Sequence, residues 1–171
     1  MPCSAALIKA PVCVKEDVTV KDAMALMSGH GLRTLPVMDG HGRFVGMFGL
    51  NVLLDNLLPV SVRMQDGLER LDFLEGASPG VAKRLLKLEK KRVSELMISV
   101  ADLPTIHAET AIWEGIRMMV VHGSPLAAVD PQTGLFQGLL SEQSVIANLE
   151  HVIEEMEKTP DVYFHKNKNN G

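Results

Sequence analysis

Residues 35–48 read LPVMDGHGRFVGMF, and residues 126–140 read LAAVDPQTGLFQGLL. In both stretches two short apolar runs flank a turn built from Asp, Gly or Pro, which is the pattern of a β-hairpin. The parts come in the same order: an apolar run ending in Asp, a glycine-bearing turn, and a second apolar run around a glycine. This recurrence predicts that the chain contains two copies of one structural unit.

The segments around the two hairpins recur as well. Apolar residues spaced i, i+3, i+4 and i+7 predict an amphipathic helix before each hairpin. A short strand is expected before that helix, and a second helix after the hairpin. The predicted segments are strands at 12–14 and 103–106, first helices at 18–27 and 110–119, and second helices at 51–58 and 142–157. Each copy is therefore expected to be a β-α-β-β-α unit of an α+β protein.

A surplus of sequence separates the two copies. It runs from 59 to 92 and becomes helical after Ser78, with Val81, Leu85 and Leu88 on one side. The last residues are polar and lack apolar periodicity, which is typical of a disordered tail. The predicted organisation is a first repeat at 1–58, a helical insert or linker at 59–92, a second repeat at 93–158 and a disordered tail at 159–171.

The composition is that of a globular protein, with 46% hydrophobic and 22% charged residues among 171. Cys3 and Cys13 match no zinc, redox or disulfide spacing, so we expect reduced thiols and a cytoplasmic protein. No apolar run reaches the roughly 18 residues of a membrane helix, so no membrane partner is expected. The formal net charge of −4 argues against nucleic acid as a partner.

Several short pieces of the repeated pattern carry a family resemblance. They are 18–23, 35–39 and 42–46 in the first copy, and 92–97, 127–130, 133–134 and 138–141 in the second. The chain resembles the CBS domain family, whose members occur as tandem pairs called Bateman modules. The resemblance implies two repeats packed with pseudo-twofold symmetry, each covering the apolar sheet face of the other. It also implies a cleft between the repeats in which the family binds adenosine nucleotides or other small ligands.

The family motif for ribose places a Ser or Thr after the second strand of the hairpin and an Asp three residues later. A carboxylate at that place can accept two ribose hydroxyls at once. The second copy has Ser141, but Ser144 stands where the Asp would be, and the first copy has Gly49 and Val52. The resemblance thus assigns ligand binding to Ser141 and Ser144. The alternatives are that Ser141 caps the following helix and that Ser144 faces solvent in its first turn.

Three further segments supply the other candidate ligand residues. Arg33 precedes the first hairpin, where the resemblance implies a basic group, and a guanidinium pairs with phosphate oxygens through two N–H groups. His30 lies in the same loop, and Ser124 lies in the matching loop of the second copy. Thr105 opens the second copy, where it would line the cleft beside the base. Each of the four is alternatively an ordinary loop or strand residue.

Two surface features lie outside this motif. Six of the 17 basic residues fall between 83 and 92, which indicates a solvated helix face or a contact with a polyanion, a partner or a nucleotide phosphate. Trp113 and Arg117 share one side of their helix, away from its apolar face. A Trp at such a position favours an association surface, and the resemblance implies a twofold homodimer formed through the helices that flank the hairpins.

Patterns of catalysis and metal binding are missing from the sequence: it has no nucleophile elbow, no Walker loop and no metal-spaced cluster of His, Cys and carboxylates. We therefore expect a regulatory, non-enzymatic module without a required cofactor. Its expected ligand is AMP, ADP, ATP or S-adenosylmethionine, and the protein that it regulates is unknown from the sequence. The alternative is a structural or protein-interaction CBS module whose ligand sites are degenerate.

Overall fold

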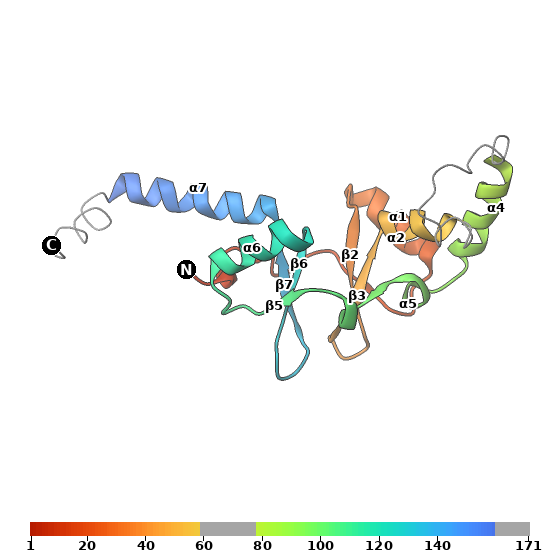
Figure 1. The fold of residues 1–171 in the computed structure, drawn as a ribbon, viewed down its shortest axis with the longest axis horizontal. Coiled ribbons are helices and arrows are strands. Elements are labelled where there is room, and N and C mark those ends of the chain that lie inside the picture. Colours follow the sequence, from red (N-terminus) through yellow and green to blue (C-terminus); the bar gives the residue numbers. More distant parts are fainter. Residues whose placement is uncertain (59–77, 160–171) are drawn as a thin grey trace. The chain divides into compact units, whose positions relative to one another are not determined.

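The structure is a computed structural model and describes residues 1–58 and 78–159 (Figure 1). The chain divides into two compact units, each holding one of the hairpins. The hairpin-one unit comprises Val12–Leu103, and the hairpin-two unit comprises Met1–Pro11 together with the chain from Pro104 onward. Both units combine helices with a small sheet, which confirms the predicted α+β class.

The hairpin-one unit contains a four-stranded sheet in the order β1-β2-β3-β4, in which only β1 and β2 are parallel. Helix α1 begins after its N-cap, Thr19. Buried side chains such as Met27, Leu35 and Phe48 form the core. The elements are β1 (Val14–Lys15), α1 (Val20–His30), β2 (Thr34–Met38), β3 (Phe44–Gly49), α2 (Leu50–Leu57), α4 (Ser78–Glu89), α5 (Val93–Leu96), β4 (Ile98–Ser99) and the 3-10 helix η4 (Val100–Asp102).

The hairpin-two unit contains a three-stranded sheet in the order β5-β6-β7, with the same directions as β1-β2-β3. Its core holds Met119, Leu126 and Leu140, and also Cys3 from the start of the chain. The elements are the 3-10 helix η1 (Cys3–Ala5), β5 (Thr105–Ile106), α6 (Ile112–His122), β6 (Leu126–Val129), β7 (Phe136–Leu140) and α7 (Glu142–Lys158). The β-α-β-β-α order of both units is the one predicted from the repeat.

An aspartate closes the turn of each hairpin in the same way. The Asp39 carboxylate accepts hydrogen bonds from the backbone N–H of Arg43 at 3.0 Å and of His41 at 2.8 Å. The Asp130 carboxylate likewise accepts two backbone N–H groups of its own turn, at 2.8 and 2.9 Å. These bonds favour the charged carboxylate, so they lower the pKa of both aspartates. The Asp that ends each first apolar run is therefore explained by the turn.

Each hairpin pairs with the segment that leads into the other repeat. Strand β4, which leads into the second repeat, pairs with β3, and Gly46 lies opposite Ser99. Ile8, which leads into the first repeat, bridges to Leu139 of β7 through N–H···O bonds of 2.8 and 3.1 Å. The compact units therefore differ from repeat boundaries drawn at 58 and 93, because the two lead-in segments are exchanged.

Two glycines permit this close pairing. A Cβ on Gly46 would collide with the Ile98 carbonyl oxygen, and a Cβ on Gly138 would lie 2.6 Å from the Ile8 carbonyl oxygen. Gly138 also has a φ of 146°, a conformation that side chains disfavour. The glycine at the centre of each second apolar run is thus required by the approach of another backbone.

The predicted insert is described from Ser78 onward. Leu85 and Leu88 of α4 pack toward the core of the hairpin-one unit, as predicted. Val81, predicted on the same side, is 45% exposed. Its exposure does not contradict the predicted side of the helix, because Val81 lies in the first turn of α4, ahead of the residues that reach the core. The rest of the predicted insert, 59–77, and the predicted disordered tail from 160 onward lie outside the described residues.

Candidate functional site

Three segments meet at one end of the β5-β6-β7 sheet. Because β5 is parallel to β6 and β7 is antiparallel to it, the starts of β5 and β6 lie beside the end of β7. Thr105 begins β5 and is exposed, Ser124 lies just before β6, and Ser141 directly follows β7. These residues and Ser144, in the first turn of α7, are called the hydroxyl edge. The hydroxyl edge brings together the four ligand residues predicted for the second repeat.

Ser141 and Ser144 form a reciprocal cap at the N-terminus of α7. The Ser144 backbone N–H donates to Ser141 Oγ at 3.1 Å, and the Ser141 backbone N–H donates to Ser144 Oγ at 3.0 Å. The Ser144 hydroxyl also donates to the Ser141 carbonyl oxygen at 3.0 Å, so its one proton is already in use. Ser141 is therefore a helix cap, which is the alternative to ligand binding that the sequence left open. As a cap its Oγ acts as an acceptor, which leaves its hydroxyl proton for a further partner.

Glu142 adds a carboxylate to this end of the sheet. It is exposed in the first turn of α7, and a hydrogen bond from the Ser124 side chain lowers its pKa. A carboxylate held in its charged form can accept hydroxyl donors, as the Asp of the motif would. Glu142 is absent from the predicted ligand residues, although an acidic side chain in the first turn of a predicted helix is a recognisable signal.

The matching edge of the hairpin-one unit has no hydroxyl at the motif positions. Gly49 is the N-cap of α2, and Val52 is buried in the core. A Cβ on Gly49 would lie 2.6 Å from Asn51 Oδ1 and 3.1 Å from the Arg33 carbonyl oxygen. Local packing therefore disfavours a side chain at 49, and this edge lacks both side-chain oxygens of the motif.

Arg33 and His30 belong to the hairpin-one unit. The Arg33 side chain is exposed, while its carbonyl oxygen accepts the Leu50 backbone N–H at 3.0 Å. His30 is the last residue of α1 and is exposed too. The structure therefore divides the predicted ligand residues into the hydroxyl edge in one unit and this exposed basic pair in the other.

Other reactive side chains do not form a second cluster within the described ranges. In residues 1–58 and 78–159, no group of three or more His, Cys, Asp or Glu is arranged to hold a metal ion. Cys3 and Cys13 are both free; Cys3 is buried, and burial raises the pKa of its thiol. No helix in these two ranges has the length and apolar content needed to cross a membrane.

Residues 4–59 match the family model of the CBS domain. The first repeat is thus similar to a CBS domain. The chain is 24% identical over 139 residues to the cyclic di-AMP receptor B of Bacillus subtilis (strain 168), an alignment covering 81% of this chain and 78% of that one. CBSX2, a CBS-pair protein from Arabidopsis thaliana, superposes with a TM-score of 0.67 at 20% identity, over 90% of this chain and 96% of that one. A structure of CBSX2 in complex with AMP gives a TM-score of 0.64 at 21% identity, over 89% and 98% of the two chains.

The CBS family model covers the first repeat and stops just after α2. The CBS structures extend the likeness to nearly the whole chain. Both units therefore share the fold of a CBS pair, which confirms the resemblance drawn from the two hairpins. At these identities the solved CBS structures establish the fold and leave the ligand to be argued from the residues of this chain.

Proposed function

We propose that this protein is a regulatory module that binds an adenine nucleotide or a related adenosyl ligand and has no catalytic activity of its own. The observation that carries the proposal is the hydroxyl edge, where four hydroxyl residues lie at the same end of one sheet and one of them, Ser124, donates to the Glu142 carboxylate. Two similar proteins support the ligand class, since one is named as a cyclic di-AMP receptor and another was solved with AMP.

The hydroxyl edge has the chemistry that a ribose needs. The Ser141 hydroxyl keeps a proton that it can donate to a ribose oxygen. The Glu142 carboxylate can accept the ribose hydroxyls that the Asp of the family motif would take. Because Gly49 and Val52 provide neither group in the hairpin-one unit, we expect one ligand per chain, bound at the hydroxyl edge.

The remaining candidate residues suit the other parts of a nucleotide. Thr105 is exposed at the start of β5 and is proposed to lie beside the base. Arg33 is proposed to contact phosphate, since its exposed guanidinium can donate two N–H groups to one phosphate. His30 is proposed to assist it. Arg33→Ala should therefore weaken binding of a diphosphate or triphosphate more than binding of adenosine.

Regulation would follow if the ligand binds one of two conformations of the protein more tightly than the other. A ligand shifts the equilibrium between two conformations only by the difference in its affinity for them. We further propose a cytoplasmic homodimer formed through α6, where Trp113 is 79% exposed. The regulated protein is not identified by any residue described above.

A second candidate function is a protein-interaction module that binds no adenosyl ligand. Three motif positions favour it. Gly49 has no side chain, Val52 is buried, and the Ser144 hydroxyl donates within the cap of α7.

A thermal-shift experiment separates the two functions. The full chain is melted with AMP, ADP, ATP, S-adenosylmethionine and cyclic di-AMP, each at several concentrations. A ligand at 100 times its dissociation constant should add about 2.7 kcal/mol of stability. A rise in melting temperature with at least one ligand supports the sensor, whereas no rise with any of the five supports the interaction module.

A further inference from the structure

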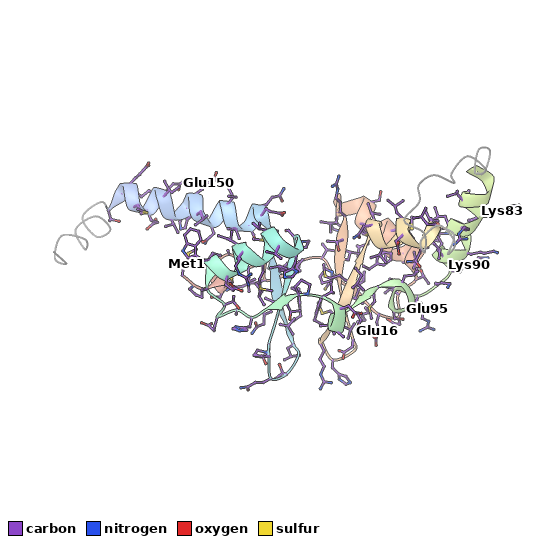
Figure 2. All side chains as sticks on the ribbon, in the orientation of Figure 1. Met1, Glu16, Lys83, Lys90, Glu95 and Glu150 are labelled. Carbon is purple, nitrogen blue, oxygen red and sulfur yellow. The ribbon has the colours of Figure 1, made fainter. Side chains whose placement is uncertain are left out.

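The exposed side of α4 carries a regular row of lysines. Leu85 and Leu88 face the core of the hairpin-one unit. Because an α-helix has 3.6 residues per turn, Lys83, Lys87 and the following Lys90 lie on the opposite side. All three are exposed, and Figure 2 labels Lys83 on α4 and Lys90, which directly follows it.

The exposed side of α7 carries glutamates at the same spacing. Val145 and Leu149 face the core of the hairpin-two unit, which places Glu150, Glu154 and Glu157 on the outer side of the helix. All three glutamates are exposed, and Figure 2 labels Glu150 on α7. The spacing i, i+4, i+7 therefore occurs twice, with opposite charge.

An exposed apolar residue interrupts each row at the same place. Leu86 follows Lys83 by three residues and is 58% exposed, and Ile153 follows Glu150 by three residues and is 54% exposed. The α4 row is defined as Lys83-Leu86-Lys87-Lys90, and the α7 row as Glu150-Ile153-Glu154-Glu157. The two rows have one pattern of charged and apolar side chains, differing in the sign of the charge.

Neither row is neutralised within the part of its own unit that the structure describes. The ion pairs recorded between described residues are Arg117 with Glu114 and Lys158 with Glu155, which lie outside both rows. Among the described residues, each row therefore keeps its charge for another surface. The α4 row repels a second α4 row and attracts an α7 row.

We propose that the α4 row of one copy of this chain docks on the α7 row of a second copy. Two helices lying side by side and parallel would set Lys83 against Glu150, Leu86 against Ile153 and Lys90 against Glu157, over about 10 Å of helix. Opposite charges steer the encounter and fix the register, while the apolar pair is removed from water. Each copy carries both rows, so a twofold dimer makes this contact twice. The contact goes beyond ligand binding and does not depend on it.

The test uses two charge-reversed variants of the full chain. The α4-reversed variant carries Lys83→Glu, Lys87→Glu and Lys90→Glu. The α7-reversed variant carries Glu150→Lys, Glu154→Lys and Glu157→Lys. Because all six side chains are exposed, circular dichroism and melting should show that both variants fold like the wild type.

A control separates the contact from a general effect of net charge. It carries Lys15→Glu, Lys21→Glu and Arg43→Glu, which are exposed in the hairpin-one unit and lie outside α4. Analytical ultracentrifugation gives the dissociation constant for the wild type, the control, each reversed variant alone and an equimolar mixture of the two reversed variants. The dissociation constant of the wild type is also measured at low and high salt. This salt dependence tests the contact even if a variant fails to fold.

We expect each reversed variant alone to dissociate at least about tenfold more readily than the wild type. The equimolar mixture should form dimers as tight as those of the wild type. The glutamates in the α4 row of one variant then face the lysines in the α7 row of the other, and the two native rows face each other as before. The mixture thereby distinguishes a contact between copies from one within a chain. Salt should weaken the wild-type dimer, since the Debye length falls from about 10 Å at 0.1 M to about 3 Å at 1 M.

Unchanged self-association of both reversed variants, or a mixture that stays unpaired, would overturn the proposal. A wild type that is monomeric in low salt would overturn it as well. Inorganic polyphosphate serves as a polyanion probe in the same experiment. If the α4-reversed variant loses polyphosphate binding while its self-association is unchanged, the α4 row belongs to a polyanion and the proposed contact is wrong.

Discussion

Ser141 has two roles here, as the N-cap of α7 and as a proposed ribose donor. Ser141→Ala removes the cap, which costs about 1 kcal/mol of stability, and one ligand hydrogen bond, which weakens binding up to roughly tenfold. Thr19→Ala is the matched control, because Thr19 caps α1 in the hairpin-one unit and is not a ligand candidate. Denaturation should show similar losses of stability, and calorimetry should show weaker binding for Ser141→Ala alone. Equal affinities of the two variants would remove Ser141 from the site.

The hydrogen bond from Ser124 is the largest cause of the lowered pKa of Glu142. It favours the carboxylate, so the pKa of Glu142 lies below its ordinary value of 4.5. Ser124→Ala should raise this pKa toward the ordinary value, which carboxyl-carbon NMR can follow across acidic pH. The bond stabilises the fold above the ordinary pKa, and this contribution, small because Glu142 is exposed, is lost as pH falls through the folded pKa. An unchanged titration of Glu142 would show that the serine does not contact it in solution.

The two kinds of site residue differ in how far the sequence can predict them. Ser141 and Ser144 were predictable, because Ser141 follows a strand directly and Ser144 stands at the Asp position of a local motif. Glu142 was not, because its environment depends on Ser124, which approaches it only when β6 and β7 pair. Val81 shows a related limit, since helical periodicity gives the side of a helix but not how far the neighbouring core extends along it.

Among the elements, the hairpins and their flanking helices were predictable from periodicity and turn residues. The pairing of the lead-in segments was not. Ile8 with Leu139, and Ile98 with Met47, join residues far apart in the chain. No local pattern encodes such a partner. The exchange of the two lead-in segments between the compact units is therefore visible only in the structure.

The exchanged pairing makes Gly138 a sensitive position. Gly138→Ala would place a Cβ 2.6 Å from the Ile8 carbonyl oxygen in a strained backbone, so we expect a loss of at least about 1–3 kcal/mol of unfolding free energy. Gly40→Ala is the control, since nothing lies within 4 Å of its Cβ position, and it should change stability by less than about 0.5 kcal/mol. Chemical denaturation measures both. Equal stabilities would show that the Ile8 pairing does not form in solution.

For the whole molecule, the exposed Trp113 predicts self-association. Trp113 is 79% exposed on α6. Truncation of a Trp buried at an interface often costs about 2 kcal/mol or more of binding free energy. Light scattering should therefore report about twice 18.7 kDa for the wild type. Trp113→Ala should shift the protein toward the monomer, whereas Leu135→Ala, at a residue exposed beside the second hairpin turn, should not. A wild type of single-chain mass at micromolar concentration would contradict the dimer.

Binding of an adenosyl ligand at the hydroxyl edge is the central claim, and titration calorimetry on the full chain measures it most directly. The ligands are AMP, ADP, ATP, S-adenosylmethionine and cyclic di-AMP, each at constant salt. We predict saturable binding of at least one mononucleotide or S-adenosylmethionine, with one ligand per chain and with lower affinity in Ser141→Ala and Glu142→Gln. Thr19→Ala should bind like the wild type. Absence of binding heat for all five ligands, or two equal sites per chain, would contradict the assignment of the ligand to this edge.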